Sequence, residues 1–147
     1  MSQRVLCLGN SLLADDAFGF AVAEQLRRTQ PGLDVVESSA AGFDLLDYAV
    51  GATRLVVVDT FQTGSAPPGS VHVFRESYVR PAAGCAPHYV GLFEALQLGK
   101  ALALALPEEV TILAVESADC LTVGGAMHPA VRAAVGAVAD LVRKLTA

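Results

Sequence analysis

The chain has 147 residues, enough for one domain with a continuous core and too few for two ordinary domains. Fifteen acidic and ten basic residues give a net charge of −5, which argues against a nucleic-acid-binding surface, because such a surface needs clustered basic residues. The mean hydropathy of +0.48 is high, yet the longest candidate apolar run, Ala101 to Leu106, is far shorter than the about 18 residues of a membrane span. We therefore expect one soluble, cytoplasmic domain over residues 1–147 that binds neither nucleic acid nor membrane.

Strand and helix patterns alternate along the chain, as they do in proteins built from βαβ units. The helices are predicted from apolar residues spaced three and four positions apart, and Pro129 suits the first position of the last helix. In chain order we expect a strand over 4–8, a helix over 17–28, a strand over 33–36, a short helix over 42–50, strands over 55–58 and 71–74, a helix over 89–105, a strand over 110–115 and a helix from 129.

Two strands indicate how the sheet is built. The continuous β-branched run Val56-Val57-Val58 predicts a central parallel strand that is buried on both faces and ends at Asp59. His72 turns the 71–74 segment into an alternation of apolar and polar residues, which is typical of an edge strand and allows an antiparallel one. The expected fold class is therefore α/β, a single three-layer αβα domain. Its sheet is a mostly parallel, twisted one of about five strands, with one antiparallel edge strand.

The three cysteines, Cys7, Cys85 and Cys120, contain no C-x-x-C pair and leave one thiol unmatched. Their spacing indicates neither a disulfide framework nor a thiolate metal site. We expect Cys7 and Cys120 to be ordinary packed or loop thiols, because a free cysteine is usually buried.

Ligands of open α/β sheets bind at the carboxyl ends of the strands, and three chain segments place polar side chains there. Asp15 and Asp16 follow the first strand, Asp59 ends the 55–58 strand, and His88 begins the helix after the 77–87 loop. Each has an ordinary structural alternative, namely a helix cap, a turn bonded to its own backbone, or a surface residue. One acid is enough to cap a helix, so the second member of the Asp15-Asp16 pair is left for another contact.

An antiparallel 71–74 strand requires the loop that follows it to return the chain to the edge where the other strands end. The eleven residues 77–87 span up to about 36 Å, so His88 is expected beside Asp16 and Asp59. Two carboxylates and one imidazole suit a borderline transition metal better than Mg²⁺ or Ca²⁺. Three protein ligands would also leave coordination positions open for a substrate. His72 and His128 are weaker candidates, one on an edge strand and the other directly before a proline.

Several better-defined motifs are absent from the sequence. No G-x-G-x-x-G follows the first strand and no G-x-x-x-x-G-K-[ST] occurs, so neither a dinucleotide-binding fold nor a P-loop is supported. Ser11 does not lie in a G-x-S-x-G motif, and H-E-x-x-H does not occur.

Several segments occur in an order and spacing that is similar to a known family. They are Gly9-Asn10-Ser11-Leu12-Leu13-Ala14-Asp15-Asp16-Ala17-Phe18-Gly19, Gly42 with Leu45-Leu46, Val56-Val57-Val58-Asp59, Pro67-Pro68-Gly69, His88 to Leu96, and Gly124-Gly125 with Pro129-Ala130-Val131. The pattern resembles the hydrogenase maturation proteases, endopeptidases that remove the C-terminal extension of [NiFe]-hydrogenase large subunits. The first segment looks like the family's G-N-x-L-x-x-D-[DE]-x-x-G opening, and the resemblance covers almost the whole chain.

The resemblance implies that Asp16, Asp59 and His88 are the catalytic and metal-contacting residues, and that Asp15 has a structural role. It also implies that the metal is nickel, supplied by the large-subunit precursor that the protease cuts and not permanently bound. The nickel would act as an anchor or as a Lewis acid, which the residues alone do not decide. Many members of the family have Glu where this chain has Asp16.

Two other functions remain as alternatives. A non-catalytic nickel-binding or chaperone-like hydrogenase assembly factor would use the same three residues. A phospho-receiver-like module is less well supported, because its acidic pair directly follows the first strand and its lysine follows the last, where this chain has Glu116. Phe61, Tyr78 and Tyr89 are expected near the crevice, either exposed to dock a protein substrate or packed as core aromatics.

Overall fold

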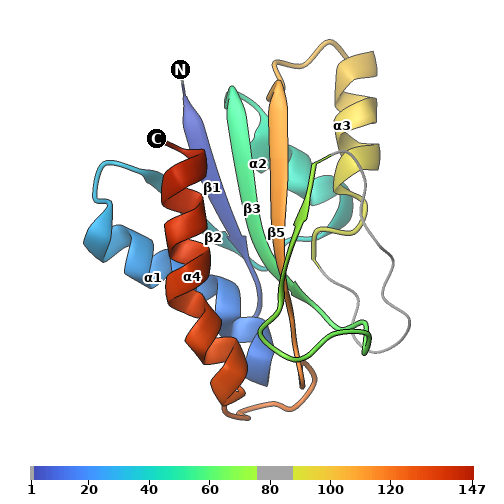
Figure 1. Ribbon diagram of the computed structural model, residues 1–147. Helices are drawn as coiled ribbons and strands as arrows, with labels where there is room; N and C mark the ends of the chain where they lie inside the picture. Colours follow the sequence, from blue (N-terminus) through green and yellow to red (C-terminus); the bar gives the residue numbers. More distant parts are fainter. Residues whose placement is uncertain (1, 76–87) are drawn as a thin grey trace.

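The computed structural model describes residues 2–75 and 88–147, and in it helices cover both faces of a five-stranded sheet (Figure 1). The strand order is β2-β1-β3-β5-β4. The strands are β1 (Gln3–Leu8), β2 (Asp34–Ser38), β3 (Arg54–Phe61), β4 (Val71–Phe74) and β5 (Glu109–Glu116). Neighbouring strands run parallel except at the edge, where β4 pairs antiparallel with β5. The predicted α/β class and the antiparallel edge strand are confirmed.

The two faces of the sheet have separate apolar clusters because the buried strands point alternate side chains to opposite sides. Val5 and Cys7 of β1 pack in the cluster that also holds α1 (Phe18–Thr29) and α4 (Pro129–Leu145). Leu6 and Leu8 pack in the other cluster, with the 3-10 turn η2 (Gly42–Leu45), the short helix α2 (Leu46–Ala49) and α3 (Leu92–Ala101). A second 3-10 turn, η1 (Ala14–Ala17), links β1 to α1.

Most predicted bounds shift by no more than two residues, and three elements differ in kind or extent. The 42–50 segment is a 3-10 turn followed by one short α-helical turn, and it ends where Val50 adopts an extended conformation. The 89–105 helix is shorter, because Gly91, with φ of +88°, cannot continue a right-handed helix and α3 begins only at Leu92. β3 does not end at Asp59, since pairing with β5 continues through Thr60 to Phe61. Asp59 is therefore held inside a strand.

The expectation for the cysteines is correct for one residue and wrong for another. Cys7 is a buried free thiol whose burial raises its pKa to about 12. Cys120 is disulfide-bonded, a pairing that spacing does not reveal because it joins residues outside any short motif. The 77–87 loop and Tyr78 lie outside the described residues.

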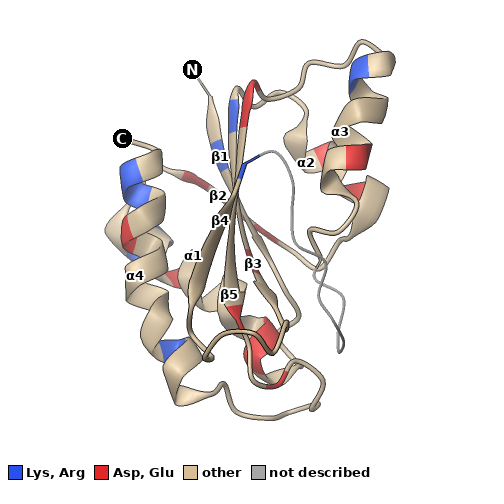
Figure 2. Ribbon diagram, turned by 45° about the vertical axis from the view of Figure 1, so that its right-hand side comes forward, with Lys and Arg blue, Asp and Glu red and all other residues tan. Residues whose placement is uncertain are grey.

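The charged residues are unevenly distributed over the fold. Figure 2 shows acidic segments at the end of the sheet where β3 and β5 finish, and others on α3 and at the start of β5, while the basic segments lie mostly on α4 and near the starts of the strands. No helix within residues 2–75 and 88–147 is long and apolar enough to cross a lipid bilayer.

Candidate functional site

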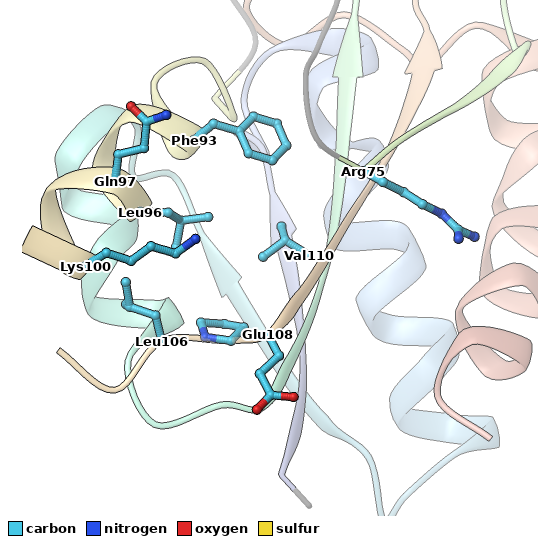
Figure 3. Close-up of a pocket in the computed structure, with 9 residues that line it drawn as sticks. Arg75, Phe93, Leu96, Gln97, Lys100, Leu106, Glu108 and Val110 are labelled. Atoms are coloured by element: carbon cyan, nitrogen blue, oxygen red, sulfur yellow. The ribbon is translucent and has the colours of Figure 1, made fainter. Parts of the chain in front are cut away.

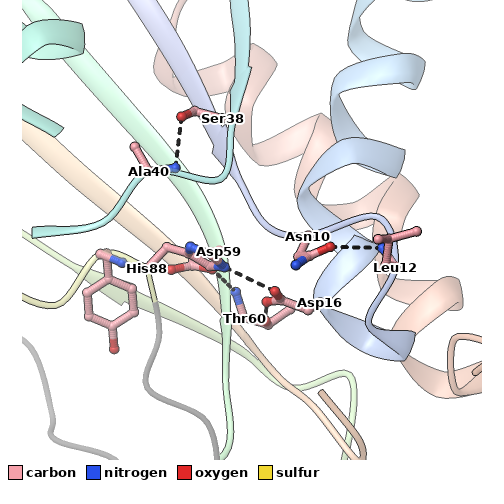
Figure 4. A network of polar contacts seen from close by, with 9 residues as sticks. Asn10, Leu12, Asp16, Ser38, Ala40, Asp59, Thr60 and His88 are labelled. Carbon is pink, nitrogen blue, oxygen red and sulfur yellow. Dashed lines mark hydrogen bonds and ion pairs between the residues drawn. The ribbon is translucent and has the colours of Figure 1, made fainter. Parts of the chain in front are cut away.

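Asp16, Asp59 and His88 meet at the carboxyl end of the parallel strands, as predicted (Figure 4). Asp16 comes from η1, Asp59 from the central strand β3, and His88 from the turn before α3. Nε2 of His88 lies 3.0 Å from Oδ2 of Asp16. All three are largely withdrawn from solvent: the side chains of Asp16 and His88 are 8% and 18% exposed, and Asp59 is fully buried.

Two glycines allow close backbone contacts that determine the position of Asp16. A Cβ at Gly9 would lie 2.2 Å from the carbonyl oxygen of Asp16, and one at Gly19 would lie 2.3 Å from that of Leu8. The same Asp16 carbonyl accepts a hydrogen bond of 3.0 Å from the Asn10 backbone N–H. The Asn10 side chain then accepts from the Leu12 backbone N–H at 3.0 Å and fixes the turn. The chain therefore folds back on itself between β1 and α1, and this sets the position of Asp16.

Asp15 points away from Asp16 and binds a loop from the other end of the chain. Its Oδ2 accepts hydrogen bonds from the backbone N–H groups of Ala118 and Asp119, at 2.7 and 2.8 Å. Its Oδ1 accepts from the N–H of His128 at 2.6 Å. Asp15 is completely buried, and backbone donors satisfy both of its oxygens. The side chain thus holds η1 against the 118–128 segment.

Thr60 contacts both Asp16 and Asp59, and it was not among the residues predicted from the sequence. Its hydroxyl donates to Oδ1 of Asp16 at 3.1 Å, and its backbone N–H donates to Oδ1 of Asp59 at 2.8 Å (Figure 4). The remaining oxygen of Asp59 accepts from the backbone N–H of Tyr89 at 2.9 Å. A threonine directly after a candidate acid could have pointed to Thr60. It was missed because the strand was expected to end at Asp59.

The surroundings of His88 favour its charged form. The hydrogen bond to Asp16 is the main reason that its pKa rises to about 9, from an ordinary value of 6.5. Burial opposes the rise, while the charges of Asp59 and Asp16 and a backbone hydrogen bond with Ala40 add to it. At neutral pH His88 is therefore largely the imidazolium, 3.0 Å from Asp16.

The surroundings of Asp59 have opposing effects on its pKa. Burial raises its pKa from 3.8 to about 7, because the charged form loses its hydration. The nearby charge of His88 and the N–H groups of Thr60 and Tyr89 act against the rise, and the charge of Asp16 adds to it. Asp59 therefore exchanges a proton near neutral pH, the property expected of a group that takes part in acid–base chemistry.

The other candidates have structural roles or are not poised as ligands. His128 accepts from the backbone N–H of Ala130 and caps α4, and His72 lies edge-on to Phe61 with ring centroids 4.8 Å apart. Phe61 and Tyr89 are buried, so the idea that they dock a substrate is wrong and the packed alternative holds. Across the described ranges, no group of three or more His, Cys, Asp or Glu side chains is arranged as a ready-made metal site.

A cavity of about 340 Å³ lies elsewhere, between α3 and the beginning of β5 (Figure 3). Phe93, Lys100 and Glu108 are among its lining residues, and none of the acid–histidine cluster is. It lies beside the amino end of β5, whereas Asp16, Asp59 and His88 lie at the carboxyl end of the parallel strands, so it is not part of the candidate site.

Comparison with known proteins identifies the family. The model of the hydrogenase maturation protease family matches residues 20–145. The chain belongs to this family. Asp59 and His88 lie inside the matched segment, and Asp16 lies just before it.

Among curated proteins, the hydrogenase expression/formation protein HupM of Azotobacter chroococcum mcd 1 is 30% identical over 135 residues, which cover 88% of this chain and 64% of HupM. The hydrogenase 2 maturation protease of Escherichia coli K12 is 30% identical over 102 residues, 65% of this chain and 62% of that protease. The matches thus span less than two thirds of the length of these two relatives.

Solved structures of family members share the fold. The maturating endopeptidase HybD of E. coli superposes with a TM-score of 0.78 at 24% identity, covering 97% of this chain and 90% of HybD. The [NiFe] hydrogenase maturation protease HybD of Thermococcus kodakarensis gives a TM-score of 0.74 at 24% identity, covering 99% of both chains. At this level of identity the likeness concerns the architecture.

Proposed function

We propose that this protein is an endopeptidase that removes the C-terminal extension of a nickel-loaded [NiFe]-hydrogenase large-subunit precursor. The observation that carries the proposal is the meeting of Asp16, Asp59 and His88 at the carboxyl edge of the sheet, in a chain of the hydrogenase maturation protease family. Relatives named as hydrogenase maturation proteases support the reaction class.

The donor set fits a borderline metal such as nickel. Two ligands about 2.1 Å from such a metal, at a right angle to each other, are about 3.0 Å apart. Nε2 of His88 and Oδ2 of Asp16 have this separation. A metal ion carried by the substrate would therefore take the place of the proton between them, without requiring either side chain to move far. Each oxygen of Asp59 accepts one backbone hydrogen bond and keeps a second lone pair.

In this proposal the substrate supplies the nickel and the protein supplies position and proton transfer. Asp16 and His88 hold the metal and, with it, the adjoining peptide bond. Asp59, with a pKa near neutrality, accepts or returns the proton of the attacking water. Thr60 is an unsuitable nucleophile, because it is only 3% exposed and its hydroxyl donates to Asp16.

A non-catalytic nickel-binding or chaperone-like assembly factor is the second candidate, since the same three residues would serve it. The test is incubation of the purified protein with nickel-loaded and nickel-free precursor, followed by intact mass measurement. Loss of a C-terminal peptide from the loaded precursor alone is the expected result. Binding without cleavage of any cognate precursor would favour the assembly factor, and cleavage of both forms would contradict recognition through nickel.

A further inference from the structure

Thr60 hydrogen-bonds to both candidate acids with its own atoms. Its hydroxyl reaches Asp16 and its backbone N–H reaches Asp59, although the two acids lie on different elements. The contact is buried, because Thr60 is 3% exposed, Asp16 is 6% exposed and Asp59 is fully covered. A hydrogen bond to a charged group is stronger away from water, so the contact from Thr60 helps to fix the position of the Asp16 carboxylate.

The two oxygens of Asp16 have different partners. Oδ1 accepts from the Thr60 hydroxyl at 3.1 Å, and Oδ2 lies 3.0 Å from Nε2 of His88. A carboxylate can rotate about its last bond, and without a fixed partner either oxygen can face the histidine. The hydroxyl removes this freedom by holding Oδ1, so that Oδ2 faces His88.

The strand fixes Thr60 itself. Thr60 is paired with Val115 of β5, one position beyond the Asp59–Ala114 pair, near the carboxyl end of the central strand β3. Successive side chains of a strand point to opposite faces, so Thr60 and Asp59 leave β3 on opposite sides. The backbone N–H of Thr60 nevertheless returns to the Asp59 carboxylate. Thr60, held by strand pairing, therefore fixes the position of Asp16 relative to Asp59.

We propose that Thr60 is a positioning residue, whose hydroxyl orients Asp16 so that one defined oxygen, Oδ2, meets the substrate's metal together with His88. This role deepens the proposed function and rests on it. Thr60 touches neither the metal nor the peptide bond, and it acts only through Asp16.

Replacement of Thr60 by valine isolates the hydroxyl. The Thr60→Val variant keeps the branched shape and the backbone N–H to Asp59, and it loses only the bond to Asp16. The Thr60→Ser variant keeps the hydroxyl and loses a methyl group. Thr111→Val is a matched control, since Thr111 is also nearly buried in a strand and pairs with Val56, away from the acids.

Cleavage of nickel-loaded precursor is the first measurement. We expect Thr60→Val to lower kcat/KM by about tenfold to a hundredfold, the range of one hydrogen bond to a charged group. Thr60→Ser should stay within about threefold of the parent, and Thr111→Val should be unchanged. An equal loss in the serine variant would overturn the assignment, because packing of the methyl group would then be the cause. Should the valine variant not fold, Thr60→Ala serves in its place.

The second measurement needs no substrate. The ring ¹⁵N NMR signals of His88 report its contact with Asp16 at fixed pH, and His72 and His128 provide internal references. Thr60→Val should shift the His88 signals alone, and Thr60→Ser should restore them. Unchanged His88 signals in the valine variant, or shifted signals with parental cleavage, would each contradict the proposal. If the parent cleaves no precursor, the proposed function fails, and the NMR comparison alone decides whether Thr60 positions the pair.

Discussion

Oδ2 of Asp16 lies 3.0 Å from Nε2 of His88, although 72 positions separate the two residues in the chain. The contact joins the turn after β1 to the turn before α3, so it exists only when the sheet is assembled. Substitutions in this pair therefore need two measurements, one of the reaction and one of the stability of the fold.

Conservative changes in this pair should abolish cleavage and leave folding nearly intact. For Asp16→Asn or His88→Gln we expect kcat/KM to fall at least about a hundredfold, the lower range for a group that acts in acid–base or electrostatic catalysis. The melting temperature, measured on the same samples, should fall moderately, because the side chains nearly keep their size but the contact between them is lost. Asp44→Asn, at an exposed acid on η2, is the control and should behave as the parent. Parental activity in either site variant would remove that residue from the site.

Replacement of the neighbouring acid, Asp15, should mainly reduce the stability of the protein. Asp15→Ala leaves the backbone N–H groups of Ala118, Asp119 and His128 without their acceptor. Each such group costs about 1–3 kcal/mol when it stays buried, and these three are only part-buried, so we expect a loss of about 1–3 kcal/mol in the free energy of unfolding. Urea denaturation measures it. An Asp15→Ala protein with parental stability and no cleavage would show instead that Asp15 takes part in the reaction.

Gly9 should not tolerate a methyl group. A Cβ at this position would lie 2.2 Å from the Asp16 carbonyl oxygen, so the turn must move. For Gly9→Ala we expect destabilisation of about 1–3 kcal/mol, as in other overpacked sites, together with reduced cleavage.

Two other glycines provide matched controls for Gly9, because nothing lies within 4 Å of a Cβ at Gly32 or Gly136. Gly32→Ala should be close to neutral. Gly136→Ala lies inside α4 and should stabilise the protein by about 0.5–1 kcal/mol. Equal destabilisation in all three variants would show that the close contact at Gly9 is not the cause.

The protein should lose stability as the pH rises above neutrality. The pKa of His88 is raised in the folded protein from 6.5 to about 9, so the folded state holds this proton more tightly than the unfolded chain does. The resulting stabilisation is complete below pH 6.5 and is lost as the pH rises through about 9. Asp59, with its pKa raised from 3.8 to about 7, gives a similar downward slope at lower pH, between these two values.

Denaturation midpoints between pH 8 and pH 10 isolate the contribution of His88, because Asp59, with a pKa of about 7, has largely lost its proton by pH 8. We expect the parent midpoint to fall across the range and that of His88→Gln to stay flatter. Parallel curves for the two proteins would contradict a raised pKa at His88.

The sequence predicted much of the fold and three residues of the site for definite physical reasons. Continuous apolar runs such as Val56–Val58 mark strands that are buried on both faces, and the alternation around His72 marks the antiparallel edge. Asp16, Asp59 and His88 could be grouped because the carboxyl ends of parallel strands share one edge. Their proposed roles toward nickel stay predictions.

What the sequence did not reveal depends on contacts between distant residues. Asp15 binds backbone groups more than a hundred positions away, and backbone N–H groups have no signature in sequence. The extension of β3 to Phe61 depends on pairing with β5, and with it the position of Thr60. The pairing of Cys120 was missed for the same reason.

The hydrogen bond from the His128 N–H to Asp15 has a consequence for synthesis. The turn that carries Asp16 is held by a segment near the far end of the chain, so a nascent polypeptide on the ribosome has Asp16 and His88 but not their support. The site is completed only when residue 128 has left the exit tunnel. The position of Asp16 is therefore fixed only after a segment more than a hundred residues further along the chain has been made.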